Sequence, residues 1–273
     1  MADLTHLKQR LSNITSVHEI TEAMQIISTI LIGRAQKLLL YRRKTQPYFE
    51  RLILSIDPST VNIHKAIKNE WVIIFFSEKG FVSSFNQQLL PLIIKHRNNP
   101  NIIVIGEKGK RYCERLKIPY KYFFHGATSV PKESIIEPIF QILKEEKFPW
   151  KTTIIMNTYS NMFKQKPSIL ELFPTTETDI YKPTQAITDI DQLILDELII
   201  EKFVRDRLYY FFIQNYTGEI GSKLLVMKNA VDNSEKLKAD IKRDIYIARQ
   251  TAITQELSEV VSAYKVLQSR EAK

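Results

Sequence analysis

Proline is absent from both ends of this 273-residue chain. All eleven prolines lie between Pro47 and Pro183, so the first 46 residues and the last 90 contain none. Because proline removes a backbone donor and clashes with the preceding helical turn, it ends or kinks helices. The distribution therefore predicts two long terminal helices around a separate globular unit.

The first proline-free segment has the apolar spacing of a helix, which we expect over residues 3–45. Apolar residues recur there at steps of three and four and so fall on one helical face. They are Leu4, Leu7, Leu11, Ile14, Ile20, Met24, Ile27, Leu31 and Leu38.

The last segment keeps the same spacing from residue 191 to residue 268. Gly218 and Gly221 lie inside it and permit either close packing or a bend. Two apolar stripes of this length are most simply buried against each other as a coiled coil. The sequence does not fix the direction of the pair, although attachment of both helices to one central domain favours an antiparallel arrangement.

The proline-bearing middle alternates between strand-like and helix-like segments. Apolar runs of strand length occupy residues 71–76, 102–105 and 152–156, and helical patterns lie between them. This alternation is typical of an α/β layer structure with a mainly parallel sheet. The predicted fold is therefore a long antiparallel coiled coil of N- and C-terminal helices plus a central α/β (Rossmann-like) domain. We place the first shaft helix at 1–56, the central domain at 57–190 and the second shaft helix at 191–273.

Composition excludes several classes of protein. An apolar fraction of 44% and a charged fraction of 25% are ordinary for a folded chain, and the net charge of +9 is spread along the sequence. No nucleic-acid recognition module is visible, which argues against a nucleic-acid partner. No secretory signal and no bilayer-length apolar stretch is expected. The single cysteine, Cys113, is expected to be a small buried residue.

The sequence contains no convincing active site. The segment Gly106-Glu-Lys-Gly109-Lys110 resembles a phosphate loop, but that motif needs four residues between its glycines and Ser or Thr after the lysine. A tight strand-to-helix turn is the better interpretation. The five histidines lack paired metal-ligand spacing. We therefore expect no catalytic residue, no cofactor and no bound metal.

The most specific motifs lie in the C-terminal segment. They are Met227-Lys-Asn-Ala-Val-Asp-Asn233 and Ala248-Arg-Gln-Thr-Ala-Ile-Thr-Gln-Glu-Leu-Ser-Glu-Val-Val261. The N-terminal segment adds Ile20-Thr-Glu-Ala-Met24 and Arg34-Ala-Gln36. Together these motifs closely resemble the gamma subunits of F-type ATP synthases, and the match extends over nearly the whole chain.

The resemblance implies a non-catalytic central rotor-stalk subunit. Such a subunit couples ion flow through a c ring, of protons or sodium, to conformational change at catalytic sites in beta subunits. The implied partners are three alpha subunits, three beta subunits, an epsilon subunit and the c ring. Association with the membrane is expected only through the complex, peripherally and on the cytoplasmic face of a bacterial inner membrane.

The resemblance also implies three sets of contact residues. Arg249 and Gln250 match the catch that meets a beta subunit, and Thr251 adjoins them. Tyr181 and Lys182 are expected at the foot toward the c ring. The bearing surface of the shaft is expected at Met24, Ile27, Leu31, Ile253, Leu257, Val260 and Tyr264.

Several positions depart from the family pattern. Glu19, Glu22 and Leu31 stand where lysines are usual, Lys182 replaces a common glutamate, and Tyr264 is bulky where the shaft is normally slim. These departures keep one alternative open, the rotor of a specialised F-type-like ATPase with altered coupling. A second alternative, of a different class, is a coiled-coil scaffold or nucleic-acid tether with a basic surface.

Overall fold

The computed structural model describes residues 2–54, 70–173 and 192–271. The chain divides into two compact units. The first combines Met1–Ile26 with Met227–Lys273, and the second is Ile27–Val226. The predicted domain limits near residues 56 and 190 lie outside the described residues and stay predictions.

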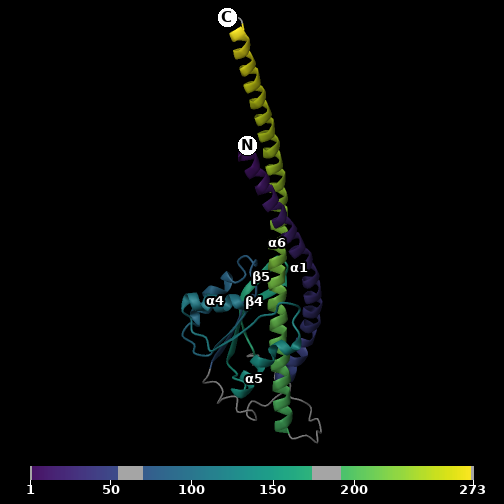
Figure 1. The fold of residues 1–273 in the computed structure, drawn as a ribbon. Coiled ribbons are helices and arrows are strands. Elements are labelled where there is room, and N and C mark those ends of the chain that lie inside the picture. The colour runs from purple at the N-terminus through teal and green to yellow at the C-terminus, as the bar shows by residue number, and fades with distance from the viewer. Residues whose placement is uncertain (1, 55–69, 174–191, 272–273) are drawn as a thin grey trace. The chain divides into compact units, whose positions relative to one another are not determined.

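The first unit is an antiparallel pair of helical segments. They belong to α1 (Ala2–Leu54) and α6 (Gln192–Glu271). His18 Nδ1 lies 2.9 Å from Ser234 Oγ, and the N-terminal part of α1 runs beside α6 in the opposite direction (Figure 1). The favoured antiparallel arrangement is therefore confirmed.

Helix α1 contains the first proline of the chain. The apolar spacing predicts a helix as far as Thr45, within a shaft segment placed at 1–56, and α1 passes through Pro47 and ends at Leu54. Pro47 cannot donate to the carbonyl of Arg43, which costs one helical hydrogen bond. The apolar face nevertheless continues to Ile53, which is buried in the core of the second unit, and this packing outweighs the local cost.

The second unit contains a five-stranded sheet in the order β3-β2-β1-β4-β5. The strands are β1 (Trp71–Phe75), β2 (Ile102–Ile105), β3 (Tyr122–Phe124), β4 (Thr152–Asn161) and β5 (Lys164–Glu171). The first four run parallel, in a register that pairs Val72 with Ile102 and Trp71 with Thr152, and β5 is antiparallel to β4. The mainly parallel sheet is confirmed, whereas β3 and β5 were not predicted.

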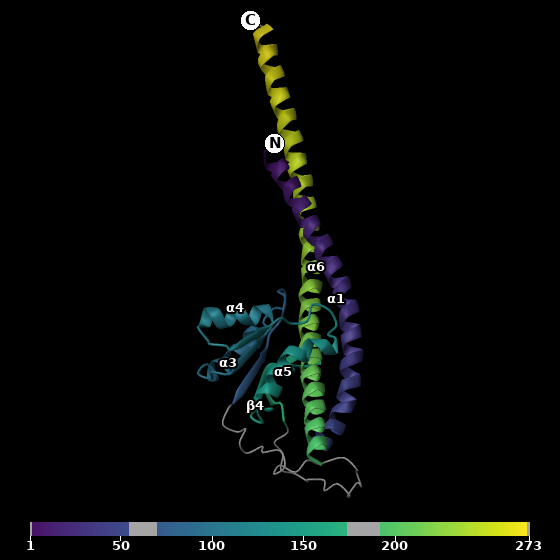
Figure 2. The ribbon, with the colours of Figure 1, turned by 60° about the horizontal axis from the view of Figure 1, so that its bottom comes forward.

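Helices cover both faces of this sheet (Figure 2). On one face lie η1 (Gln87–Leu89), α3 (Leu90–Lys95) and α4 (Glu107–Leu116). On the other face lie η2 (Glu133–Ile136), α5 (Glu137–Glu145) and the parts of α1 and α6 that belong to this unit. The α6 segment contributes the large buried side chains of Phe203 and Phe211 to that second core.

The segment that resembles a phosphate loop is a strand-to-helix turn, as expected. Gly106 follows β2 with φ of 96°, a backbone conformation that favours glycine, and α4 begins at the next residue. Gly109 lies where α4 meets the sheet. A Cβ atom there would come within 2.4 Å of the Phe76 ring and 2.8 Å of a Val104 methyl group.

Gly109→Ala is therefore expected to destabilise the fold by about 1–3 kcal/mol, because the added methyl group overpacks a helix–sheet contact. The matched control is Gly33→Ala in α1, where an added Cβ meets nothing within 4 Å. That control should raise the free energy of unfolding by about 0.5–1 kcal/mol, because alanine loses less backbone entropy than glycine when a helix forms. Urea unfolding of both full-length variants measures the difference. Equal effects of the two substitutions would contradict the close packing at Gly109.

Candidate functional site

The predicted catch residues lie together on the surface of α6. Arg249, Gln250 and Thr251 are consecutive and all exposed. The hydroxyl of Thr251 donates to the backbone oxygen of Ile247 at 3.0 Å, so its side chain is held against its own helix. The side chains of Arg249 and Gln250 are exposed.

The C-terminal bearing residues form an exposed apolar stripe on α6. Ile253, Leu257, Val260 and Tyr264 are exposed to 47%, 61%, 67% and 61% and follow one another at steps of four, three and four. This spacing places them on one helical face. We call these four residues the α6 stripe.

The register of the helix pair explains why the α6 stripe is exposed. Since His18 lies beside Ser234 in an antiparallel pair, the start of α1 at Ala2 falls opposite residue 250 or so of α6. Within the first unit, α6 therefore continues beyond the described part of α1 (Figure 1). The apolar face loses its helical cover at the stripe.

The structure does not gather all the predicted bearing residues in one place. By the same register, half-buried Met24 lies opposite residue 228 or so, roughly 37 Å along α6 from Ile253. In the second unit Ile27 is exposed, whereas Leu31 is half-buried against a cluster that includes Tyr216. The apolar character of Leu31 thus has a local packing explanation. Tyr181 and Lys182 lie outside the described residues.

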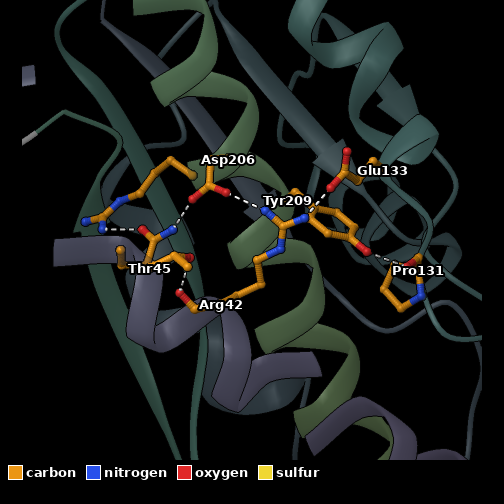
Figure 3. Close-up of polar contacts among 8 residues, drawn as sticks. Arg42, Thr45, Pro131, Glu133, Asp206 and Tyr209 are labelled. Atoms are coloured by element: carbon orange, nitrogen blue, oxygen red, sulfur yellow. Dashed lines mark hydrogen bonds and ion pairs between the residues drawn. The ribbon is translucent and has the colours of Figure 1, made fainter. Parts of the chain in front are cut away.

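Sequence reasoning missed a polar network inside the second unit (Figure 3). Asp206 of α6 is buried, and its two carboxylate oxygens accept from Arg42 Nη1 and Gln46 Nε2 of α1, each at 2.5 Å. Arg42 also pairs with Glu133 and lies over the Tyr209 ring, 4.7 Å from its centroid. The network thus fixes α1 against α6 and against the start of η2.

Burial raises the pKa of Asp206, and the charge and hydrogen bond of Arg42 act against that rise. The sequence contained one usable indication of this network. Arg42 and Gln46 are four residues apart and occupy one side of a helix beside an otherwise apolar face. Their shared partner is Asp206, which lies 164 residues after Arg42 in the sequence. Local sequence patterns do not reveal a contact over that separation.

A second buried carboxylate lies further along α6. Glu219 accepts from the backbone N–H groups of Glu78 and Lys79, each at 3.2 Å. Burial raises the pKa of Glu219 to about 7, and the two backbone hydrogen bonds and the charge of Lys223 lower it. Burial in turn lowers the pKa of Lys223.

Other chemical features do not form a site. The Cys113 thiol is buried, as expected, and burial raises its pKa to about 11. Across the described ranges, no three His, Cys, Asp or Glu side chains are grouped so that they could hold a metal ion. Every helix in the described part of the chain is too short or too polar to cross a bilayer.

Comparison with known proteins identifies the family of this chain. A family model described as ATP synthase matches residues 3–267. The chain belongs to the ATP synthase gamma-chain family. The ATP synthase gamma chain of Acetivibrio thermocellus is 25% identical, over 98% of this chain and all of that protein. That of Buchnera aphidicola subsp. Melaphis rhois is 24% identical over 96% and 97% of the two chains.

Solved structures show the same fold. A chain of the Euglena gracilis mitochondrial ATP synthase OSCP/F1/c-ring structure aligns with a TM-score of 0.66, covering 99% of this chain and 96% of its own, at 14% identity. A chain of the Tetrahymena thermophila central stalk and c-ring structure aligns with a TM-score of 0.60, over 77% and 99% of the two chains, at 17% identity. A gamma chain is a non-catalytic, peripheral component of the ATP synthase complex, which agrees with the lack of a convincing active site in the sequence.

Arg42→Met is expected to lower the free energy of unfolding by about 3–5 kcal/mol, because it leaves the buried Asp206 carboxylate without its ion-pair partner. The double variant Arg42→Met/Asp206→Leu should lose less than the single variant, since no uncompensated charge remains. Exposed Arg51 of the same helix provides the control, Arg51→Met, with a change below about 0.5 kcal/mol. Chemical denaturation checks all three, and an equal loss in the single and double variants would refute the argument.

Glu219→Gln is expected to stabilise the chain at pH 8 by about 3 kcal/mol, the linkage value for a carboxyl group whose pKa rises from 4.5 to about 7. The folded state binds the proton more tightly than the unfolded state. The stability of the wild type therefore falls as pH rises from about 4.5 to about 7, and the cost is fully present above that window. Denaturant unfolding of the wild type and the variant at pH 5 and pH 8 measures this cost. A variant no more stable than the wild type at pH 8 would show that ionised Glu219 is not penalised.

Proposed function

We propose that this chain is the central rotor-stalk subunit of an F-type ATP synthase. In this role it couples ion flow through a c ring to conformational change at beta-subunit catalytic sites. The observation that carries the proposal is the α6 stripe, an apolar face at helical spacing on a part of α6 beyond the described part of α1. An exposed apolar surface of this kind marks a contact with another protein.

The fold supports the same role. The structural neighbours are described as the rotor, the OSCP/F1/c-ring part and the central stalk of mitochondrial ATP synthases. On that basis we assign three alpha subunits, three beta subunits, an epsilon subunit and a c ring as partners of this chain. We further propose that it lies peripherally on the cytoplasmic face of a bacterial inner membrane, in a complex that translocates protons or sodium.

The contact residues follow from this role. We propose that the α6 stripe turns against the surrounding ring of alpha and beta subunits. Met24, Ile27 and Leu31 of α1 would contact the same ring. Arg249, Gln250 and Thr251 would make the polar catch with a beta subunit. Exposed polar contacts are individually weak, which suits a surface that meets three partners in turn. Tyr181 and Lys182 would face the c ring.

Co-purification from membranes of the source cell, through an affinity tag on this chain, tests the proposal. Recovery of alpha, beta, epsilon and c subunits is the expected result. Alpha- and beta-like subunits without a c ring would indicate instead the rotor of a specialised F-type-like ATPase. Recovery of none of them would overturn the proposal in favour of a scaffold with a basic surface.

Leu257→Lys is expected to reduce ATP synthesis by the complex about tenfold, since a charge in the α6 stripe opposes its burial against the ring. The control, Glu259→Lys, makes a larger change of charge on another side of the helix, away from the stripe and from Thr251, and should change synthesis less than twofold. Both side chains are exposed, so the unfolding of the isolated chain should not change in either variant. Equal rates of ATP synthesis by the two complexes would show that the α6 stripe does not contact the ring.

A further inference from the structure

The sheet has a switch point between β1 and β4. Strand β1 is flanked by β2 on one side and β4 on the other, so the chain leaves β1 in one direction and later returns on its opposite side. In doubly wound folds, ligands bind outside the carboxyl ends of the strands at such a point. The space beyond β1 and β4 is therefore the first place to look for a bound group.

The chain's own side chains fill that space. The loop between β1 and η1, residues 76–86, contributes buried Ser77, Phe85 and Asn86. Strand β4 contributes Asn157, and α6 contributes Asn215 and Glu219, all of them buried. The usual ligand position of this fold is thus occupied by a contact between the sheet and α6.

The contact is made through the backbone of the 76–86 loop. Asn215 Nδ2 donates to the Phe76 carbonyl oxygen at 3.2 Å, directly after β1. One turn later, Glu219 accepts from the N–H groups of Glu78 and Lys79 at 3.2 Å each. Two residues of α6 therefore hold three residues of the loop. Asn215 binds the carbonyl oxygen of Phe76, and Glu219 binds the N–H groups of Glu78 and Lys79.

A glycine lets the helix approach this loop. A Cβ atom on Gly218 would lie 3.0 Å from the ring of Phe85, closer than nearly all real contacts of this kind. Gly221, one turn later, would carry its Cβ 3.3 Å from the Gln165 amide of β5. From the sequence, these two glycines allowed either a bend or close packing. Both lie in an unbroken helix, so they permit close packing.

The loop is itself fastened to the rest of the unit. The backbone N–H of Ser77 donates to Asn86 Oδ1 at 3.0 Å, and Asn157 Nδ2 donates to the Phe85 carbonyl at 2.6 Å. The Glu78 carboxylate accepts from the N–H of Glu107 at 3.0 Å, at the start of α4. A displacement of α6 at Asn215 and Glu219 therefore acts on β4 and α4 as well as on β1.

The charges around Glu219 show what its carboxylate contributes. The titratable side chains that interact with it are Lys223 and Tyr216 on α6 and Glu78 on the loop, whereas Lys79 contacts it through its backbone N–H. Burial raises the pKa of Tyr216 to about 12, so that group stays neutral. Because ionised Glu219 is penalised by burial, its charge adds nothing to global stability. What the charge provides is stronger hydrogen bonds to two defined loop amides.

We infer that Asn215 and Glu219 are positioning residues that lock α6 to the 76–86 loop, so that load carried along α6 passes to the sheet at its switch point. The inference rests on the proposed rotor function, because only a rotor needs such a joint under load. The fold's ligand position has then become the attachment point of its own helix.

Amide exchange in the full-length chain tests the joint itself. In Glu219→Ala, protection factors of the Glu78 and Lys79 amides should fall at least tenfold, while those of β1 stay within threefold. Glu219→Gln keeps a hydrogen-bond acceptor, so the protection factors of the same two amides should fall about fivefold or less. In the wild type, both protection factors should fall by a similar factor from pH 8 to pH 6, and in Glu219→Gln they should not change. The control is Glu197→Gln, at an exposed position of the same helix.

The assembled complex tests the role of the joint. Glu219→Ala should lower ATP synthesis at least fivefold relative to ATP hydrolysis, and Glu219→Gln should restore most of that ratio. If Glu219→Ala does not fold, Asn215→Leu is used instead, with the same loss of coupling expected. Unchanged coupling in a variant that has lost amide protection would overturn the inference. Failure of the wild-type chain to assemble with its partners would instead refute the rotor function itself.

Discussion

The complete burial of one stretch of α6 is the constraint on which the rest of the structure depends. Residues 211–222 are buried without exception, although they lie in a helix of 80 residues. A helix buried on all sides cannot be stable alone, because each of its faces needs a separate cover. The sheet provides one cover through Phe75 and Ile213, and α1 provides another through Ile32 and Ile220. Within the second unit, the sheet and the α1 segment thus pack against the same stretch of α6.

Polar side chains within this buried stretch define how α6 is seated. Asn215 and Glu219 reach the 76–86 loop, and the Thr217 hydroxyl donates to the Ile213 carbonyl of its own helix at 2.7 Å. A shift of α6 by one turn would separate Glu219 from the two N–H groups that it accepts from. Because an unpaired buried charge costs several kcal/mol, about as much as the whole fold can lose, the polar groups select one register among several of similar packing.

The sequence predicts most strongly what repeats over many residues. The two terminal helices follow from sustained three- and four-residue spacing, and three strands follow from short apolar runs beside turn residues. Strand β3 has three half-buried residues and β5 is an edge strand that contains Pro167, so neither carries a strong local pattern. The ion pair of Arg42 with Asp206 joins distant parts of the sequence, and no periodicity reveals it. The spacing of the α6 stripe is visible in the sequence, but its exposure depends on packing against α1, which the spacing does not specify.

The two helices tolerate proline differently, and burial explains why. Pro47 lies in an exposed position of α1, where water can satisfy the carbonyl that loses its partner. Within residues 211–222 of α6 no water is available, so each lost helical bond would leave an unpaired buried group. The absence of proline from this buried stretch is therefore a requirement of its packing.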